Sequence, residues 1–140
     1  MNERQKTDTI VIHCADTPDD RDVDMATIKK WHVEERGWSD IGYHFVIRRN
    51  GLVEAGRDIK LAGAHARAVN GTSVGVCMVG RENFDPRQFE SLRDTVQMLL
   101  KLYPDSKVIG HCDVESKKPQ CPGFDVSKWF NEAIPSIDRP

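Results

Sequence analysis

Short runs of β-branched and apolar residues recur along the chain and predict its strands. Residues 9–13 form such a run and are followed by a turn-rich stretch, a pattern typical of a strand that is buried on both faces. Residues 73–79 contain almost only apolar and small side chains, which indicates a second interior strand. Residues 107–110 predict a third, short strand that ends next to His111.

A β-hairpin is predicted around Asn50-Gly51. This dipeptide separates two further strand-like runs, residues 43–47 and 52–56. Asn-Gly between two such runs is the strongest short-range signal for a hairpin, so these strands are expected to be antiparallel. The neighbouring Arg48 and Arg49 are expected to be solvated charges at the edge of the sheet.

Capping residues and helical spacing predict three helices. Asp24 can cap a helix over residues 25–35. Asp85 is followed by a proline and then by apolar residues at helical spacing, a pattern that continues until Pro104. Asp125 can cap a last, short helix.

The order of these elements predicts an α/β fold. Strands and helices are mixed throughout and one hairpin is antiparallel, so we expect a mixed β-sheet of about five strands flanked by helices. Residues 1–140 are expected to form a single domain. Within it, residues 1–8 and 135–140 are expected to be frayed tails.

Composition and charge narrow the range of functions. The 140 residues are 39% hydrophobic and 30% charged, which is ordinary for a globular domain. The 20 basic and 22 acidic side chains give a net charge of -2 and a pI near 6.2, so we expect no nucleic-acid partner. The apolar run at residues 9–14 is far too short to cross a bilayer, so no membrane insertion is expected. The opening residues lack the apolar segment of a secretory signal, which predicts a cytoplasmic location.

Three side chains suggest a metal site. His13 and His111 each stand at the end of a predicted strand, and Cys121 follows ten residues after His111. Three nitrogen and sulfur ligands that leave a fourth position for water are what catalytic zinc uses. The four cysteines form no CxxC pair, and a cytoplasmic location disfavours disulfides, so metal binding, catalysis and simple packing all remain open for them.

A series of motifs, in order along nearly the whole chain, carries a family resemblance. The chain is similar to the zinc-dependent N-acetylmuramoyl-L-alanine amidases of the type 2 amidase and peptidoglycan-recognition superfamily, and most of all to the short phage lysozymes, or endolysins, of podoviruses. Members of this superfamily have a mixed sheet with helices packed on it and a groove with zinc at its floor. The motifs are VIHCADT at 11–17, WSDIGYHFVI at 38–47, VEAGR at 53–57, GAHA at 63–66, SVGV at 73–76 and the segment 110–125 with its Gly-His and CPGFD.

The resemblance implies a role for each site residue. His13, His111 and Cys121 match the ligands of one zinc ion that activates a water. Tyr43 and Lys118 match the residues that stabilise the tetrahedral intermediate. The family's catalytic lysine lies two positions before the ligand cysteine, where this chain has a proline, so Lys117 is the reserve candidate. A glutamate base that cytoplasmic amidases carry on a neighbouring strand is replaced here by Cys77, which is expected to be an inert core thiol.

Two further histidines and two further cysteines lie in or near these motifs. By resemblance, His65 lies in the groove and contacts substrate, and we assign substrate binding to His44 as well, although His44 taken alone is typical of a structural imidazole. Cys14 and Cys112 each adjoin a predicted ligand and are interpreted as packing residues, because neighbours on a strand point to opposite faces.

The resemblance implies an endolysin that hydrolyses the amide bond between N-acetylmuramic acid and the L-alanine of the peptidoglycan stem peptide. Such an enzyme accumulates in the host cytoplasm and reaches the periplasmic wall after another protein permeabilises the membrane. The alternatives are a non-catalytic peptidoglycan-recognition module, a Cys/His nucleophilic hydrolase, or an amidase that also binds and restrains the phage RNA polymerase. A monomer is expected.

Overall fold

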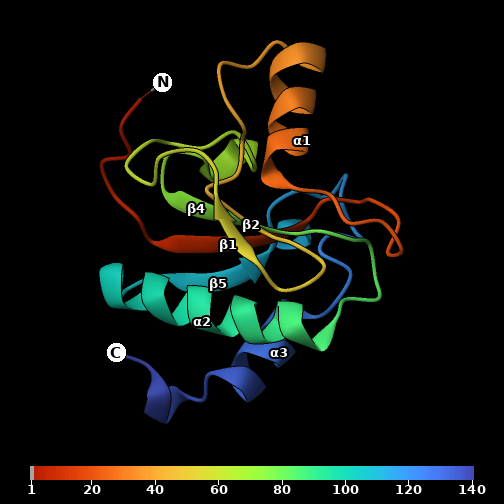
Figure 1. Cartoon of the computed structure of the whole chain (residues 1–140). Coiled ribbons are helices and arrows are strands. Elements are labelled where there is room, and N and C mark those ends of the chain that lie inside the picture. The colour runs from red at the N-terminus through yellow and green to blue at the C-terminus, as the bar shows by residue number, and fades with distance from the viewer. Residues whose placement is uncertain (1) are drawn as a thin grey trace.

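Two fully buried parallel strands, β1 (Thr9–Cys14) and β4 (Ser73–Met78), form the middle of the sheet in this computed structural model, which describes residues 2–140. The strand order is β3-β2-β4-β1-β5 (Figure 1). The remaining strands are β2 (Phe45–Ile47) and the two edge strands, β3 (Val53–Ala55) and β5 (Lys107–Gly110). Only β3 runs antiparallel, as the second strand of the hairpin, so the predicted mixed sheet is confirmed.

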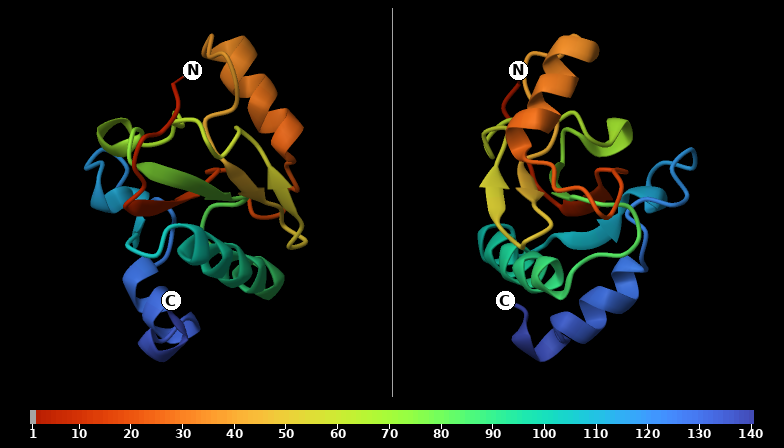
Figure 2. Two further views of the ribbon diagram at one scale, coloured as in Figure 1. Left: turned by 90° about the vertical axis from the view of Figure 1, so that its left-hand side faces the viewer. Right: turned by 45° about the vertical axis from the view of Figure 1, so that its right-hand side comes forward.

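Helices cover both faces of the sheet. Helix α2 (Pro86–Leu102) and α3 (Val126–Ala133) lie on one side, and α1 (Met25–Lys30) lies on the other (Figures 1 and 2). Each begins at its predicted aspartate cap. The helix expected over residues 25–35 is present, but its second half, Trp31–Glu35, is π-helical. Among the described residues, no helix has the length and apolar character that a membrane crossing requires.

Alternation along the strands decides which face each side chain occupies. Ile10 and Ile12 of β1 pack with Val76 of β4 in the core that α2 and α3 cover. The next position, His13, pairs with Cys77 and therefore points to the opposite face, toward the side of α1. Because side chains alternate along β1, the isoleucines lie in the core under α2 and α3, and His13 lies on the other face of the sheet.

The tails that were expected to fray are held against the domain. At the N-terminal end, Arg4 N–H donates to the Lys60 carbonyl at 2.8 Å, and the Arg4 guanidinium donates to Leu61 O at 3.0 Å and to Tyr103 Oη at 3.2 Å. At the C-terminal end, Arg139 donates to Ile134 O at 2.8 Å and stacks on Phe130. Each of the two segments thus has an arginine that contacts the rest of the domain: Arg4 reaches residues far away in the sequence, and Arg139 reaches residues of the last helix and its end.

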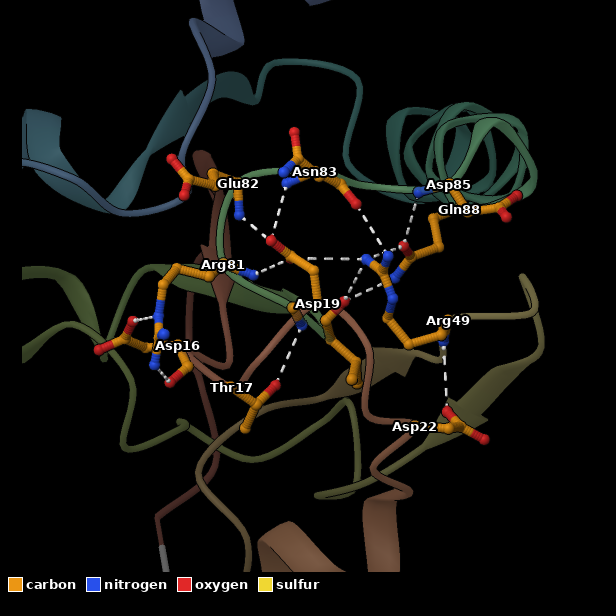
Figure 3. A network of polar contacts seen from close by, with 12 residues as sticks. Asp16, Thr17, Asp19, Asp22, Arg49, Arg81, Glu82, Asn83, Asp85 and Gln88 are labelled. Atoms are coloured by element: carbon orange, nitrogen blue, oxygen red, sulfur yellow. Dashed lines mark hydrogen bonds and ion pairs between the residues drawn. The ribbon is translucent and has the colours of Figure 1, made fainter.

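Arg49 was expected to be solvated, and it is not. Its guanidinium donates to Gln88 Oε1 at 2.9 Å and to the Asn83 carbonyl at 2.8 Å (Figure 3). It also lies 3.7 Å from the Asp19 carboxylate. Arg49 thus ties the hairpin to the start of α2 and to the loop after β1.

Candidate metal centre and substrate groove

The register of the parallel strands brings His13 and His111 together at the carboxyl edge of the sheet. Ile12 of β1 lies opposite Gly110 of β5, and each histidine is the next residue along the chain. The two imidazole centroids are 4.3 Å apart. Cys121 joins them from the loop after β5, and the candidate ligand atoms of the three residues all lie within 4.8 Å of one another. The three predicted metal ligands therefore converge, with a donor set suited to tetrahedral zinc.

Backbone hydrogen bonds hold the Cys121 thiol at this position. Cys14 N–H donates to Cys121 Sγ at 3.2 Å, which places the sulfur at the end of β1. Cys112 N–H donates to the Cys121 carbonyl at 2.9 Å and closes the loop. Cys14 is buried, as predicted for a packing residue, whereas Cys112 is exposed, so a packing role for Cys112 is wrong.

A chain of hydrogen bonds leads from His13 into the protein and determines which ring nitrogen of His13 is free to bind a metal. Ser73 Oγ lies 2.6 Å from the Val69 carbonyl, which can only accept, so the hydroxyl donates there. Ser73 Oγ therefore accepts from His65 Nε2–H at 3.1 Å. His65 Nδ1 is left without a proton and accepts from His13 Nε2–H at 2.8 Å. The lone pair of His13 is consequently on Nδ1, the nitrogen that remains for a metal.

This proton arrangement requires a neutral His65. Burial, assisted by the neighbouring His44 and His111, lowers the pKa of His65 to about 3. Burial also holds the pKa of His13 well below its usual range, with His65 and His111 contributing. Both rings are therefore neutral at physiological pH, which is the form that binds metals.

Two glycines make room for the His65 ring. A Cβ atom at Gly75 would lie 2.6 Å from His65 Cγ, and a Cβ atom at Gly63 would lie 2.6 Å from His65 Cδ2. These glycines are the ones in the GAHA and SVGV motifs. His65 lines the groove, but both of its ring nitrogens form hydrogen bonds, one with His13 and one with Ser73. His65 therefore holds the predicted metal ligand His13 in place.

His44 lies behind this layer and does not line the groove. Its side chain is buried, its Nδ1 accepts from Gly75 N–H at 3.0 Å and its Nε2 lies 2.8 Å from the Leu61 carbonyl. Burial lowers the pKa of His44 to about 4. Both ring nitrogens of His44 are thus bonded to backbone groups, those of Gly75 and Leu61. The predicted contact between His44 and substrate is replaced by a structural role.

Glu115 was not singled out from the sequence, yet it contacts a predicted ligand. Its Oε2 lies 2.5 Å from His111 Nε2. The only signal in the sequence is the spacing of four residues from His111, which on its own describes many solvent-exposed pairs. With Nε2 engaged, His111, like His13, has Nδ1 left for a metal.

Tyr43 lies just before β2 and lines the groove beside the predicted ligands. Its ring centroid is 5.1 Å from that of His13. The buried Arg57 fixes this segment, since its N–H donates to the Tyr43 carbonyl at 2.9 Å and its Nε donates to Ile41 O at 2.8 Å. Burial, with Cys77 next in effect, raises the pKa of Tyr43 well above its usual range. The phenol therefore remains a hydrogen-bond donor.

Both candidate lysines lie on the loop that carries Cys121. Lys117 and Lys118 are exposed and line the groove, whose volume is about 740 Å³. Lys118 is the better anchored of the two: its N–H donates to the Glu115 carbonyl at 3.1 Å, and its own carbonyl accepts from Cys121 N–H at 3.2 Å. Two successive turns thus connect the backbone of Lys118 to Glu115 on one side and to Cys121 on the other.

A polar network connects the loops after β1 and β4, which carry two further residues of the groove, Asp16 and Arg81 (Figure 3). Arg81 pairs with Asp16 at 2.8 Å, and both line the groove. The Asp19 carboxylate accepts from the backbone N–H groups of Arg81 at 2.7 Å and Asn83 at 3.2 Å. Asp19 therefore joins the loop after β1 to the loop after β4, and it positions Arg81 beside the groove.

Comparison with known proteins identifies the family to which the chain belongs. Residues 3–124 match the family described as N-acetylmuramoyl-L-alanine amidase. The endolysin of Enterobacteria phage K11 is 42% identical, over 92% of this chain and 89% of that protein. The endolysin of Escherichia phage T7 is 41% identical, over 97% and 95% respectively. A solved structure of the N-acetylmuramoyl-L-alanine amidase LysC from Clostridium intestinale superposes with a TM-score of 0.81 at 30% identity, covering 96% of this chain and 87% of that one.

The family match spans most of the chain, and the endolysins match it over nearly their full lengths. The same residues form the mixed sheet, with the groove at the carboxyl edge of its parallel strands. The chain is therefore an enzyme of the N-acetylmuramoyl-L-alanine amidase family, related to phage endolysins.

Proposed function

We propose that this amidase hydrolyses the bond between N-acetylmuramic acid and the L-alanine of the stem peptide with the aid of one zinc ion held by His13, His111 and Cys121. The observation that carries the proposal is the convergence of these three ligand atoms within 4.8 Å of one another, beside a groove that His111 and Cys121 line. The N₂S donor set suits zinc, which prefers nitrogen and sulfur ligands and tetrahedral geometry.

The surroundings of the three donors fit a divalent cation. His13 is neutral, and the Nε2 atoms of His13 and His111 are occupied by other partners, which leaves Nδ1 of each ring available. A hydrogen bond with Cys14 and burial raise the pKa of Cys121, which keeps the thiol protonated until a bound cation displaces the proton and the sulfur becomes a thiolate ligand. When bound, zinc polarises the scissile carbonyl and lowers the pKa of a water to about 7.

Tyr43 and Lys118 supply the remaining polar chemistry in this proposal. The protonated phenol of Tyr43 donates a hydrogen bond to the carbonyl oxygen of the scissile amide. The ammonium group of Lys118 lies along the same groove and faces the negative charge that develops on that oxygen. Each such donor contributes on the order of 3 kcal/mol to transition-state stabilisation.

The charge of the groove supports an anionic substrate. Arg36 and Arg67 line it together with the two lysines, and neither arginine forms an ion pair among the described residues. Stem peptides carry free carboxylates, which such guanidinium groups bind well. The lining thus matches peptidoglycan better than a neutral polymer.

Digestion of purified peptidoglycan, followed by mass spectrometry, tests the proposal. We expect stem peptides that begin with L-alanine from the native protein, no products after chelation, and recovery with added zinc. Cys121→Ser is expected to abolish both zinc binding and cleavage. Cys112→Ser is the matched control, because this neighbouring thiol is exposed and is not one of the three ligands.

Two outcomes would contradict the proposal. Intact peptidoglycan in every sample, with the protein still bound to it, would indicate a recognition module without catalysis. Cleavage that resists chelation but is lost on thiol alkylation would indicate a cysteine nucleophile.

A further inference from the structure

Glu115 is attached to the metal centre through both its side chain and its backbone. Its Oε2 lies 2.5 Å from His111 Nε2, and its N–H donates to the His111 carbonyl at 3.0 Å. The imidazole is almost fully buried, with 8% of its side-chain surface exposed, whereas the Glu115 side chain is 37% exposed. The carboxylate therefore covers the outer edge of a buried ring.

We propose that Glu115 is a positioning residue that holds His111 in the tautomer and orientation needed to bind zinc. Its carboxylate accepts a hydrogen bond from Nε2–H and so keeps the lone pair of His111 on Nδ1, the nitrogen left for the metal. A metal-ligating histidine commonly donates its second N–H to a carboxylate, which also makes the ligand more basic. This inference rests on the proposed zinc function.

The geometry distinguishes this role from two others. Nδ1 and Nε2 lie on different edges of the imidazole, so a carboxylate bonded to Nε2 is separated from the metal position by the ring itself. To become a metal ligand, or to accept a proton from a water at the metal, Glu115 would have to release His111. Among the described residues, His111 is the one ion-pair partner that the Glu115 side chain has.

The two histidine ligands are held in different ways. His13 donates to the neutral, buried imidazole of His65, and His65 in turn donates to the Ser73 hydroxyl. His111 donates to a carboxylate on an exposed loop. Hydrogen bonds to an ionised carboxylate are stronger than those between neutral groups, so the His111 ring is held by a strong contact from the loop that also carries Cys121.

Zinc affinity measures this role without reference to catalysis. The dissociation constant would be determined by competition with a chromophoric chelator for the native protein, Glu115→Ala, Glu115→Gln and Glu90→Ala. Glu90 is an exposed glutamate on α2, so its variant removes the same charge far from the site. We expect Glu115→Ala to bind zinc about 10- to 100-fold more weakly, and Glu90→Ala to bind as the native protein does.

Glu115→Gln is expected to recover most of the affinity, because its amide oxygen still accepts from Nε2–H. Unfolding of the metal-free proteins in urea would show that Glu115→Ala remains folded, as expected for a side chain on an exposed loop. Native zinc affinity in Glu115→Ala, whatever its activity, would overturn the inference, and so would an equal loss in Glu115→Gln and Glu115→Ala. Absence of zinc binding by the native protein would instead contradict the proposed function.

Discussion

His13 Nε2 lies 2.8 Å from His65 Nδ1, although 52 residues separate the two histidines in the chain. The contact forms because β1 and β4 pair in parallel, and because Gly75 of β4 leaves space for the His65 ring beside the strand. Ser73, on the same strand, then fixes the proton positions of both rings. A ligand of the candidate metal is thus oriented by residues from two distant motifs.

Removal of the Ser73 hydroxyl tests the hydrogen-bond chain from Ser73 through His65 to His13. We expect Ser73→Ala to weaken zinc binding about 10-fold, because His65 loses the acceptor that fixes its tautomer. Ser91→Ala is a suitable control, since Ser91 also donates to a carbonyl, that of Gly51, but lies on α2. The measurement is chelator competition, and equal zinc affinity of the two variants would contradict a role for this hydrogen-bond chain.

Substitution at Gly75 tests whether the His65 ring needs the space that this glycine leaves. In Gly75→Ala, the new methyl group would lie 2.6 Å from His65 Cγ, so the ring must move. We expect a loss of about 1–3 kcal/mol in the free energy of unfolding, as for overpacked cores, together with weaker zinc binding. At Gly71 a Cβ atom has no neighbour within 4 Å, so Gly71→Ala should be nearly neutral in urea unfolding. Similar losses of stability in Gly75→Ala and Gly71→Ala would show that the His65 ring does not need the space beside Gly75.

Tyr43→Phe separates metal binding from turnover. The ring continues to pack beside His13, so zinc affinity should remain native. Turnover should fall about 100-fold, the usual effect of losing one donor to a developing oxyanion. Measurement of kcat and of zinc affinity on the same preparations checks both expectations. A native kcat would exclude the phenol from the reaction.

The two lysines are distinguished by single alanine variants. We expect Lys118→Ala to lower kcat about 100-fold and Lys117→Ala to have a small effect, because the backbone of Lys118 is anchored to both Glu115 and Cys121. Both side chains are exposed, so the free energy of unfolding should not change in either variant. The reverse order of effects would assign the role to Lys117, and two active variants would place the donor elsewhere.

The buried His44 makes stability depend on pH. Burial lowers its pKa to about 4 in the folded protein, against about 6.5 in an unfolded chain. Between these values the unfolded chain binds more protons, so stability is greatest above about pH 6.5 and falls as the pH decreases. For His44 alone the loss at pH 5 is about 2 kcal/mol, and His32 and His65, whose pKa values are also lowered, add to it.

Urea unfolding of the chelator-treated protein at pH 7 and pH 5 measures this loss. His44→Asn should show a smaller difference between the two pH values than the native protein, by about 2 kcal/mol. Chelation removes the separate effect of pH on metal binding. An equal difference in both proteins would show that His44 is not buried in its neutral form.

The amino-acid sequence by itself determined most of the secondary structure and the identity of the candidate metal ligands. Strands β1, β4 and β5, the Asn-Gly hairpin and the three aspartate caps follow from local rules, because alternation, turn chemistry and capping each depend on a few neighbouring residues. His13, His111 and Cys121 could be named because their motifs resemble those of a known family. The π-helical second half of the first helix carried no comparable local signal.

Only the tertiary structure decided how these residues are held. The partners of His13 and Arg49, and the contacts of Arg4, depend on strand register and on loops that approach from distant parts of the chain. Glu115 is only four residues from His111, but that spacing is common among exposed pairs, so the sequence did not distinguish Glu115 from an exposed loop glutamate. Nor did the sequence distinguish His44 from a residue of the groove. A hydrogen bond requires two atoms to be placed within about 3 Å, and that placement is set by the packing of the whole sheet.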